Sequence, residues 1–152
     1  MKIEVKLDER CEETSVLIRC SEVTDEIQRV VRLLQHSSIE WVEAKRNQSS
    51  HIIHIKHILY FYAEGQKVFA QTIEDAYEVK DRLHVWEEML QARSFIRISK
   101  SVVANLEHMK RFEMMFNGNL VVFFSGDKKE YISRSYVQTV KQRLVGYRKG
   151  GQ

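Results

Sequence analysis

A short polar and basic turn between two apolar segments is the part of this sequence best suited to contact a polyanion. Residues 99–101 read Ser-Lys-Ser; they follow an expected strand that carries Arg97 and precede an apolar stretch that ends at Asn105. A cation and two hydroxyl groups at the tip of buried elements are the groups that contact phosphates and base edges in nucleic acids. An ordinary surface turn is the alternative that these three residues alone leave open.

The positive charge of the chain is concentrated in its C-terminal part. Residues 93–149 hold 12 Lys and Arg against 4 Asp and Glu, a net charge of +8, whereas residues 1–92 hold 12 against 17, a net charge of −5. The formal net charge of +3 for the whole chain conceals this asymmetry. A concentrated positive field attracts polyanions and steers them toward the protein. The asymmetry therefore favours nucleic acid as the ligand, and a basic face that only aids solubility is the alternative.

The sequence gives little support for catalysis, so we expect neither an enzyme nor a bound cofactor. It holds no glycine-rich phosphate loop, no nucleophile elbow and no HExxH motif. The adjacent acids Glu87 and Glu88 point in different directions on a helix and do not form a catalytic pair. The two cysteines, Cys11 and Cys20, lack partners for a metal site and fit reduced thiols in a cytoplasmic protein.

Two further groups of side chains have both a structural and a functional interpretation. On a strand, His51 and His57 share one face and His54 lies on the other, so we expect edge histidines and no metal site, with zinc binding as the alternative. The aromatic run from Tyr60 to Tyr62 is predicted to belong to the core, with stacking on single-stranded bases as the alternative.

Length and composition predict one domain with a small addition. The chain has 152 residues, of which 43% are hydrophobic, and this fraction is sufficient for a folded core. No stretch approaches the ~20 consecutive apolar residues of a membrane span. Residues 1–6 alternate between polar and apolar types and lack an apolar signal core, so we expect no export signal.

Residues 1–38 are predicted to form a small β-β-α extension. Residues 3–7 alternate as a half-buried strand does, and residues 16–18 fit a second strand. Thr24 can cap a helix that follows them. We place the boundary of the extension at residues 37–38. The apolar side chains of the helix recur at helical spacing: Ile27, Val30, Val31 and Leu34.

From residue 39 onward the apolar residues mostly alternate, which predicts an α+β fold that is mostly antiparallel β with short helices. Asn117-Gly118 predicts a hairpin, because both residue types tolerate positive φ. The expected elements are strands near 39–46, 67–72, 77–79, 112–116, 120–124 and 130–133, an apolar-rich run over 52–62 that forms a hairpin with 67–72, a helix near 82–91, and a last helix from Arg134 or Ser135.

Several of these segments, in this order and at this spacing, resemble the LytTR family of DNA-binding domains. The matching segments are Ile58 to Val68 (ILYFYAEGQKV), Phe95 to Ser101 (FIRISKS), Asn105-Leu106 and Tyr131 to Val137 (YISRSYV). The resemblance covers about residues 39–147 and leaves residues 148–152 as a flexible tail. In many relatives a phosphoacceptor receiver domain holds the place of residues 1–38. This extension is far too short for one, so control by phosphorylation is not expected.

The resemblance implies an elongated β fold whose loops, and not a recognition helix, enter successive major grooves, often as a dimer on paired direct repeats. Many relatives carry two basic residues at the start of the last helix, and the second is replaced here by Ser135. Lys100 and Arg134 are the first candidates for residues that determine sequence specificity, and Lys67 is the next candidate. Carried over by position, the expected contacts are Gln66 or Lys67 at the first turn, Ser99 and Lys100 at the second, and Arg134 and Ser135 at the third.

Together these observations predict a cytoplasmic, sequence-specific regulator that binds double-stranded DNA, as a homodimer. Arg97, Lys110 and Lys141 are expected to contact the DNA backbone. The alternative is a protein-interaction module with only non-specific affinity for DNA. In that case residues 1–38 dock a regulatory partner, such as the small membrane proteins that accompany some stand-alone relatives.

Overall fold

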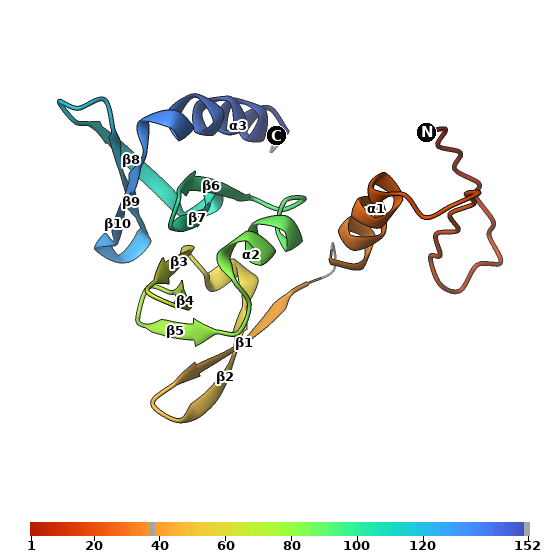
Figure 1. Ribbon diagram of the computed structural model, residues 1–152, viewed down its shortest axis with the longest axis horizontal. Coiled ribbons are helices and arrows are strands. Elements are labelled where there is room, and N and C mark those ends of the chain that lie inside the picture. Colours follow the sequence, from red (N-terminus) through yellow and green to blue (C-terminus); the bar gives the residue numbers. More distant parts are fainter. Residues whose placement is uncertain (37–38, 151–152) are drawn as a thin grey trace.

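Two antiparallel sheets and three α-helices make up the part of the chain that the computed structural model describes, residues 1–36 and 39–150 (Figure 1). The helices are α1 (Asp25–His36), α2 (Leu83–Met89) and α3 (Val137–Gly150). The strands are β1 (Trp41–Arg46), β2 (Ser49–His54), β3 (Tyr60–Glu64), β4 (Lys67–Gln71), β5 (Ala76–Val79), β6 (Phe95–Ser99), β7 (Val102–Asn105), β8 (Met109–Met114), β9 (Leu120–Phe124) and β10 (Lys129–Ile132).

Every strand pair in the two sheets is antiparallel, which confirms the predicted fold class. The larger sheet has the order β2-β1-β5-β4-β3-β7-β6, and the smaller has the order β10-β9-β8. Within the larger sheet, β3 and β7 are neighbours although about 40 residues separate them in the chain. This long-range pairing brings two distant hairpins side by side.

Each face of the larger sheet is covered by a different layer. On one face α2 packs through Trp86, whose ring stacks on Phe61 of β3 with the centroids 4.6 Å apart. On the other face the smaller sheet and α3 enclose a second core that includes Ile98, Val122 and Val140. Strands β3, β6 and β7 are therefore buried on both faces. Tyr60 and Phe61 are core residues, as predicted, which excludes them as a base-stacking platform.

Two of the predicted hairpins form around glycines with positive φ. Gly65 lies between β3 and β4 with a φ of 61°, and Gly118 lies between β8 and β9 with a φ of 83°. Residues with a side chain adopt such a φ only at a cost of about 1–2 kcal/mol, so glycine fixes both turns. The helix predicted near 82–91 is α2, and the strand predicted near 77–79 is β5.

The N-terminal extension differs from its prediction. The strands expected at residues 3–7 and 16–18 are absent, and neither helix nor strand precedes Asp25. Ile3 and Leu7 expose 81% and 96% of their surfaces, so this alternating segment has no sheet to join within the described chain. An alternating pattern describes a strand only when a partner is present. The boundary predicted at residues 37–38 lies outside the described residues.

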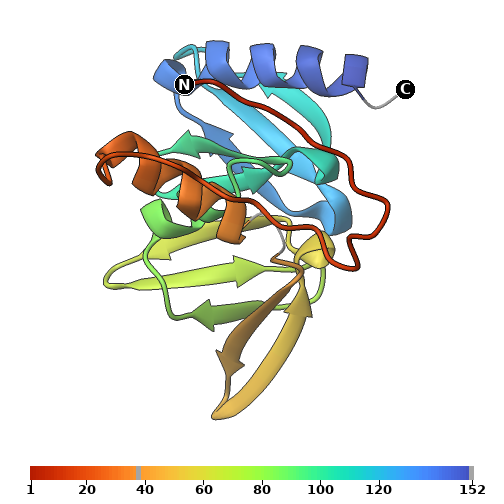
Figure 2. The ribbon, with the colours of Figure 1, turned by 90° about the vertical axis from the view of Figure 1, so that its right-hand side faces the viewer.

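The predicted helix of the extension forms as α1 and lies beside α2. The hydroxyl oxygen of Thr24 accepts a hydrogen bond from the backbone N–H of Ile27 at 3.3 Å, as an N-cap does. Helix α1 runs alongside α2 (Figure 2), and Arg32 of α1 forms an ion pair with Glu88 of α2 at 3.3 Å. The segment before α1 projects from the body in Figure 1.

The C-terminal helix is longer than expected. Helix α3 continues to Gly150, so residues 148–150 are helical and do not belong to a flexible tail. Glycine costs a helix about 1 kcal/mol but does not end it, and the chain contains no proline. Residues 151–152 lie outside the described residues. No α-helix in the described part is long and apolar enough to cross a membrane.

Candidate nucleic-acid interface

The structure brings the three predicted contact turns together at one end of the larger sheet. The backbone N–H of Ala63 donates to the carbonyl of Ser101 at 2.8 Å, which joins the β3–β4 turn to the β6–β7 turn. The backbone N–H of Ser133 donates to the carbonyl of Ile98 at 2.9 Å, which places the start of the last helix beside β6. The three turns therefore form a continuous row, which we call the basic row (residues 65–67, 99–101 and 134–135).

The first turn of the basic row presents Gln66 and Lys67. Both side chains are exposed, and the amine of Lys67 lies 3.4 Å from a carboxylate oxygen of Glu78 on β5. Exposed ion pairs of this kind contribute about 0–1 kcal/mol. A phosphate group can therefore replace Glu78 as the partner of Lys67 at little cost.

The second turn presents Lys100 from a braced backbone. The hydroxyl oxygen of Ser99 accepts a hydrogen bond from the backbone N–H of Ser101 at 3.2 Å, and the two serine hydroxyls lie 3.4 Å apart. Lys100 is exposed and forms no ion pair with any described residue. Its amine is the cation of this turn that is available to a ligand.

Arg97 lies behind the second turn, with its donors directed into the protein. Its Nη1 donates to Oε2 of Glu87 on α2 at 2.7 Å, and its Nε donates to the carbonyl of Ser99 at 2.7 Å. Its Nη2 donates to the carbonyl of Lys100. The side chain is only 19% exposed. This environment differs from the one expected for a phosphate contact, and the sequence pattern alone did not reveal it.

The third turn presents Arg134 and Ser135, which are both exposed. The tip of the β8–β9 hairpin holds Arg134 in place, because its backbone N–H donates to Oδ1 of Asn119 at 3.0 Å. Gly118 lies against the aliphatic part of the Arg134 side chain, where a Cβ on the glycine would be 2.8 Å from Cδ. The Asn-Gly signal predicted this hairpin, but nothing in the sequence indicated that its tip supports Arg134.

Two of the expected backbone contacts lie apart from the basic row. Lys110 is at the end of β8 that pairs with Phe124, whereas Arg134 follows the end of β10 that pairs with Leu120. Strand geometry places these two ends about 13 Å apart. Lys141 is exposed on α3, two helical turns after Arg134, or about 10 Å along the helix. Helix α3 runs from the row toward the other end of β6, where Arg143 donates to the carbonyl of Arg93, so neither Lys141 nor Lys110 continues the row.

The histidines predicted as edge residues make structural contacts. Nδ1 of His54 accepts the backbone N–H of Lys56 at 3.1 Å, and the ring of His54 meets that of Trp41 edge-on. The ring of His51 lies against that of Tyr77 on β5. The described residues contain no group of three or more His, Cys, Asp or Glu that could hold a metal ion.

The titratable groups with shifted pKa values lie between the sheets, away from the turns. Burial raises the pKa of Tyr60, and the nearby carboxylate of Glu130 raises it further. Burial also raises the pKa of Glu130, although its hydrogen bond with Tyr60 acts in the opposite direction. Burial likewise raises the pKa of Tyr62. These groups join β3 to β10 and do not form a catalytic constellation.

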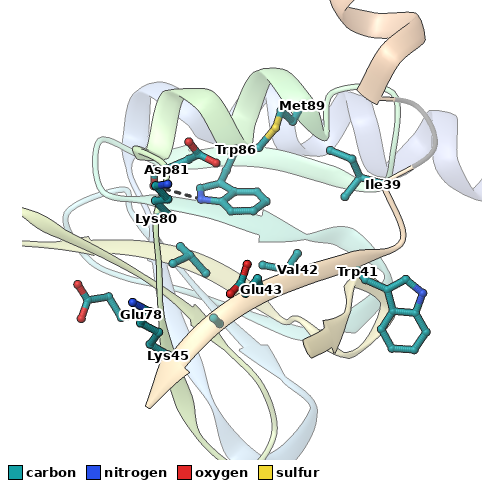
Figure 3. A pocket seen from close by; sticks show the side chains of 12 residues that line it. Ile39, Trp41, Val42, Glu43, Lys45, Glu78, Lys80, Asp81, Trp86 and Met89 are labelled. Carbon is teal, nitrogen blue, oxygen red and sulfur yellow. Dashed lines mark hydrogen bonds between the residues drawn. The ribbon is translucent and has the colours of Figure 1, made fainter. Parts of the chain in front are cut away.

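A hollow of about 610 Å³ between β1, β5 and α2 is a second site to consider (Figure 3). Trp86 forms part of its wall, and the indole N–H of Trp86 already donates to the carbonyl of Asp81 at 3.2 Å. The rim carries both charge signs, as Lys45 and Glu43 show. The hollow therefore does not select one class of ligand, and the basic row remains the candidate site.

A comparison with known protein families finds a match over more than half of the chain. Residues 48–145 match the family described as the LytTr DNA-binding domain. The chain belongs to the LytTR DNA-binding domain family. This match confirms the resemblance that the sequence showed. The family consists of transcriptional regulators, which normally do not catalyse reactions.

Relatives of similar length and a solved domain extend this comparison. The chain is 26% identical over 149 residues to an uncharacterized HTH-type transcriptional regulator of Staphylococcus aureus (strain bovine RF122 / ET3-1), covering 95% of this chain and 98% of the relative. It is 32% identical over 93 residues to the sensory transduction protein LytT of Bacillus subtilis (strain 168), covering 61% of this chain and 39% of LytT. The fold matches a LytTr DNA-binding domain from Bacillus cereus with a TM-score of 0.66 at 20% identity, over 70% of this chain and 98% of that domain.

The term HTH in the name of the S. aureus relative has no counterpart in the described parts of this chain. Helices α1, α2 and α3 are separated by strands, so no two of them follow each other as a helix-turn-helix does.

Proposed function

We propose that this LytTR-family protein is a sequence-specific transcription regulator whose turns contact successive major grooves of double-stranded DNA. The observation that carries the proposal is the basic row, which gathers Lys67, Lys100 and Arg134 from three distant segments at one end of the larger sheet. Lysine and arginine side chains on turns are suited to both phosphates and guanine edges. The net charge of +8 in residues 93–149 supports the same ligand.

The length of the basic row is close to the width of one major groove. Adjacent strands lie about 4.8 Å apart, so the β3–β4 and β6–β7 turns are separated by about 10 Å, and the start of the last helix extends the row to about 15 Å. The major groove of B-DNA is about 12 Å wide, and successive major grooves on one side of the duplex lie about 34 Å apart. One basic row therefore fits one major groove and its flanking phosphates, and the next major groove is left to the second copy of the dimer proposed below.

A selection experiment tests this function. The purified full chain is mixed with a library of random duplexes at two salt concentrations, and the bound DNA is sequenced. We expect one paired motif to be enriched and to persist at the higher salt. Binding without enrichment that disappears at higher salt means only counterion release at a basic surface, and it contradicts sequence-specific regulation.

We further propose that the protein acts as a homodimer on direct repeats and that residues 1–36 join the two copies. The exposed apolar side chains of Ile3, Val5 and Leu7 support this role, because at alternating positions they can share one face of a strand that pairs with a second copy. The same observation favours a second candidate function, the docking of a regulatory partner such as a small membrane protein. The oligomeric state separates the two, as argued in the Discussion.

A further inference from the structure

We propose that Arg97 is a positioning residue. Its ion pair with Glu87 of α2 holds the guanidinium in place, and the guanidinium holds the Lys100 turn in the geometry that reads DNA. The proposal rests on the proposed function, because it assigns Lys100 to base recognition. It differs from the phosphate contact that the charge and position of Arg97 predict. The contacts of the guanidinium decide between the two roles.

Each of the three nitrogens of the Arg97 guanidinium already donates to an acceptor of the protein. It donates from Nη1 to Glu87, from Nε to the carbonyl of Ser99 and from Nη2 to the carbonyl of Lys100. Hydrogen bonds from a charged donor are roughly twice as strong as neutral ones. A phosphate that captured this group would have to break several of them, whereas the amine of Lys100 is free in the described structure.

The turn needs such support because the sheet is irregular where the turn begins. The register of β6 on β7 shifts between Arg97 and Ser99, so the regular ladder of hydrogen bonds is interrupted there. Arg97 spans this irregularity and binds the carbonyls of Ser99 and Lys100, which belong to the two successive peptide units on either side of the Cα of Lys100. The planar fork of arginine can bind several fixed acceptors at once, which the single ammonium group of lysine cannot do.

Glu87 connects this arrangement to the core. It lies on α2 next to Trp86, which stacks on Phe61 and is almost fully buried. The backbone of Glu87 is therefore held by a packed helix, from which the half-exposed carboxylate reaches Arg97 and through it the turn. Arg97 and Ser135 also line one hollow of about 540 Å³ between α2 and the last helix, so the second and third turns share this support.

The test uses Arg97→Gln, Arg97→Lys and Glu87→Gln in the full chain, with duplexes that carry the selected motif or a scrambled one. In each variant we expect the ratio of the affinity for the motif duplex to the affinity for the scrambled duplex to fall about tenfold, since one base contact contributes about 1–3 kcal/mol of discrimination. Removal of an acid near DNA would strengthen binding if only charge mattered. A weakened selectivity in Glu87→Gln is therefore specific to positioning.

The salt dependence and the free protein supply two independent measurements. A lost phosphate contact lowers the slope of log affinity against log salt by about 1, whereas a positioning residue leaves the slope unchanged. We also expect faster amide hydrogen exchange at residues 99–101 in the unbound variants, because the turn loses its support. The matched control is the ion pair of Arg46 and Asp75, 2.9 Å apart near the β1–β2 turn, where Arg46→Gln should change none of these measurements.

Each result has a definite meaning. A slope reduced by 1 in Arg97→Gln, together with unaltered exchange at residues 99–101, shows a direct phosphate contact and overturns the proposal. Full selectivity in Glu87→Gln or in Arg97→Lys overturns it as well. If the wild-type protein itself shows no preference between the duplexes, the proposed function fails, and the assignment of Arg97 to DNA reading fails with it. If the wild-type protein prefers the selected motif and the variants keep the same preference, the positioning role of Arg97 is wrong but the proposed function stands.

Discussion

Lys100 is the side chain on which sequence specificity should depend most. Its turn is braced by Ser99, Ser101 and Arg97, while its own amine is exposed and unpaired in the described structure. We expect Lys100→Ala to cost about 1–3 kcal/mol of binding free energy and to relax the preference at one base pair. Fluorescence anisotropy with a panel of duplexes, each changed at one position, measures both effects.

The control for this prediction is Lys110→Ala. It removes the same charge from the opposite end of the smaller sheet and should leave the base preference unaltered. If Lys100→Ala retains both the affinity and the preference of the wild-type protein, Lys100 does not read a base.

A second prediction at this scale concerns the half-buried carboxyl of Glu130. Burial raises its pKa, so the folded state binds this proton more tightly than the unfolded state does. The resulting stabilisation is present below the ordinary carboxyl pKa and is lost as the pH rises through the pKa of the folded state. We expect the free energy of unfolding of the wild-type protein, relative to Glu130→Gln, to increase as the pH falls from 7 to 4.

Urea unfolding of both proteins at several pH values measures this difference. The exposed Glu43 on β1 provides the control, since Glu43→Gln should not show the same trend. A difference between wild-type protein and Glu130→Gln that is independent of pH contradicts the assignment.

The residue scale also shows what the sequence could reveal about the site. The resemblance to the LytTR family placed Lys67, Lys100 and Arg134 at three contact turns, and their contact with DNA stays a prediction. The role of Arg97 was not predictable, because it depends on Glu87, ten residues away on another element, and on carbonyl groups that carry no sequence signal. The hydrogen bond from Arg134 to Asn119 was not predictable for the same reason, since a local sequence pattern does not specify which hairpin tip contacts which helix.

At the scale of elements, the β8–β9 hairpin acts as a support for the third turn. Gly118 has a φ of 83°, and a Cβ there would lie 2.8 Å from Cδ of Arg134. We expect Gly118→Ala to lower the stability by about 1–2 kcal/mol through backbone strain and also to displace Arg134. Thermal unfolding measures the first effect, and DNA titration should show weaker binding.

Gly126→Ala is a closely matched control for this substitution. Gly126 has a φ of 73°, and its Cβ would lie 2.7 Å from the side chain of Ile73 at the other end of the smaller sheet. The two variants should lose similar stability, but only Gly118→Ala should lose DNA affinity. Equal DNA affinities would show that the hairpin tip does not position Arg134.

The elements that the sequence predicted well are those that depend on local signals. Turn residues and helical periodicity located the β3–β4 and β8–β9 hairpins, α1 and α2. The prediction of two strands before α1 was wrong, because apolar and polar residues can alternate in a segment that has no neighbouring strand to pair with. The order of the strands was not predictable either, since the pairing of β3 with β7 is a long-range contact. That pairing is what brings the first two contact turns together.

At the scale of the whole molecule, the protein has one end suited to DNA and one segment suited to another copy. The basic row occupies one end of the larger sheet, while the segment before α1 exposes Ile3, Val5 and Leu7 on alternating positions. Strand β2 is at the edge of the larger sheet in the described chain, with one side unpaired. An alternating apolar segment and an open sheet edge on the same molecule favour association between copies.

We therefore expect the triple variant Ile3→Asn, Val5→Asn and Leu7→Asn to convert a dimer into a monomer, as measured by sedimentation at matched concentrations. Folding should persist, because these side chains make no contribution to the core. Affinity for a duplex with one half-site should stay the same, whereas affinity for paired repeats should fall about 100-fold as the avidity is lost. A dimer that survives the triple substitution rules out this segment as the link. If the wild-type protein is a monomer, the dimer proposal is wrong and the exposed segment is instead assigned to the binding of a different protein.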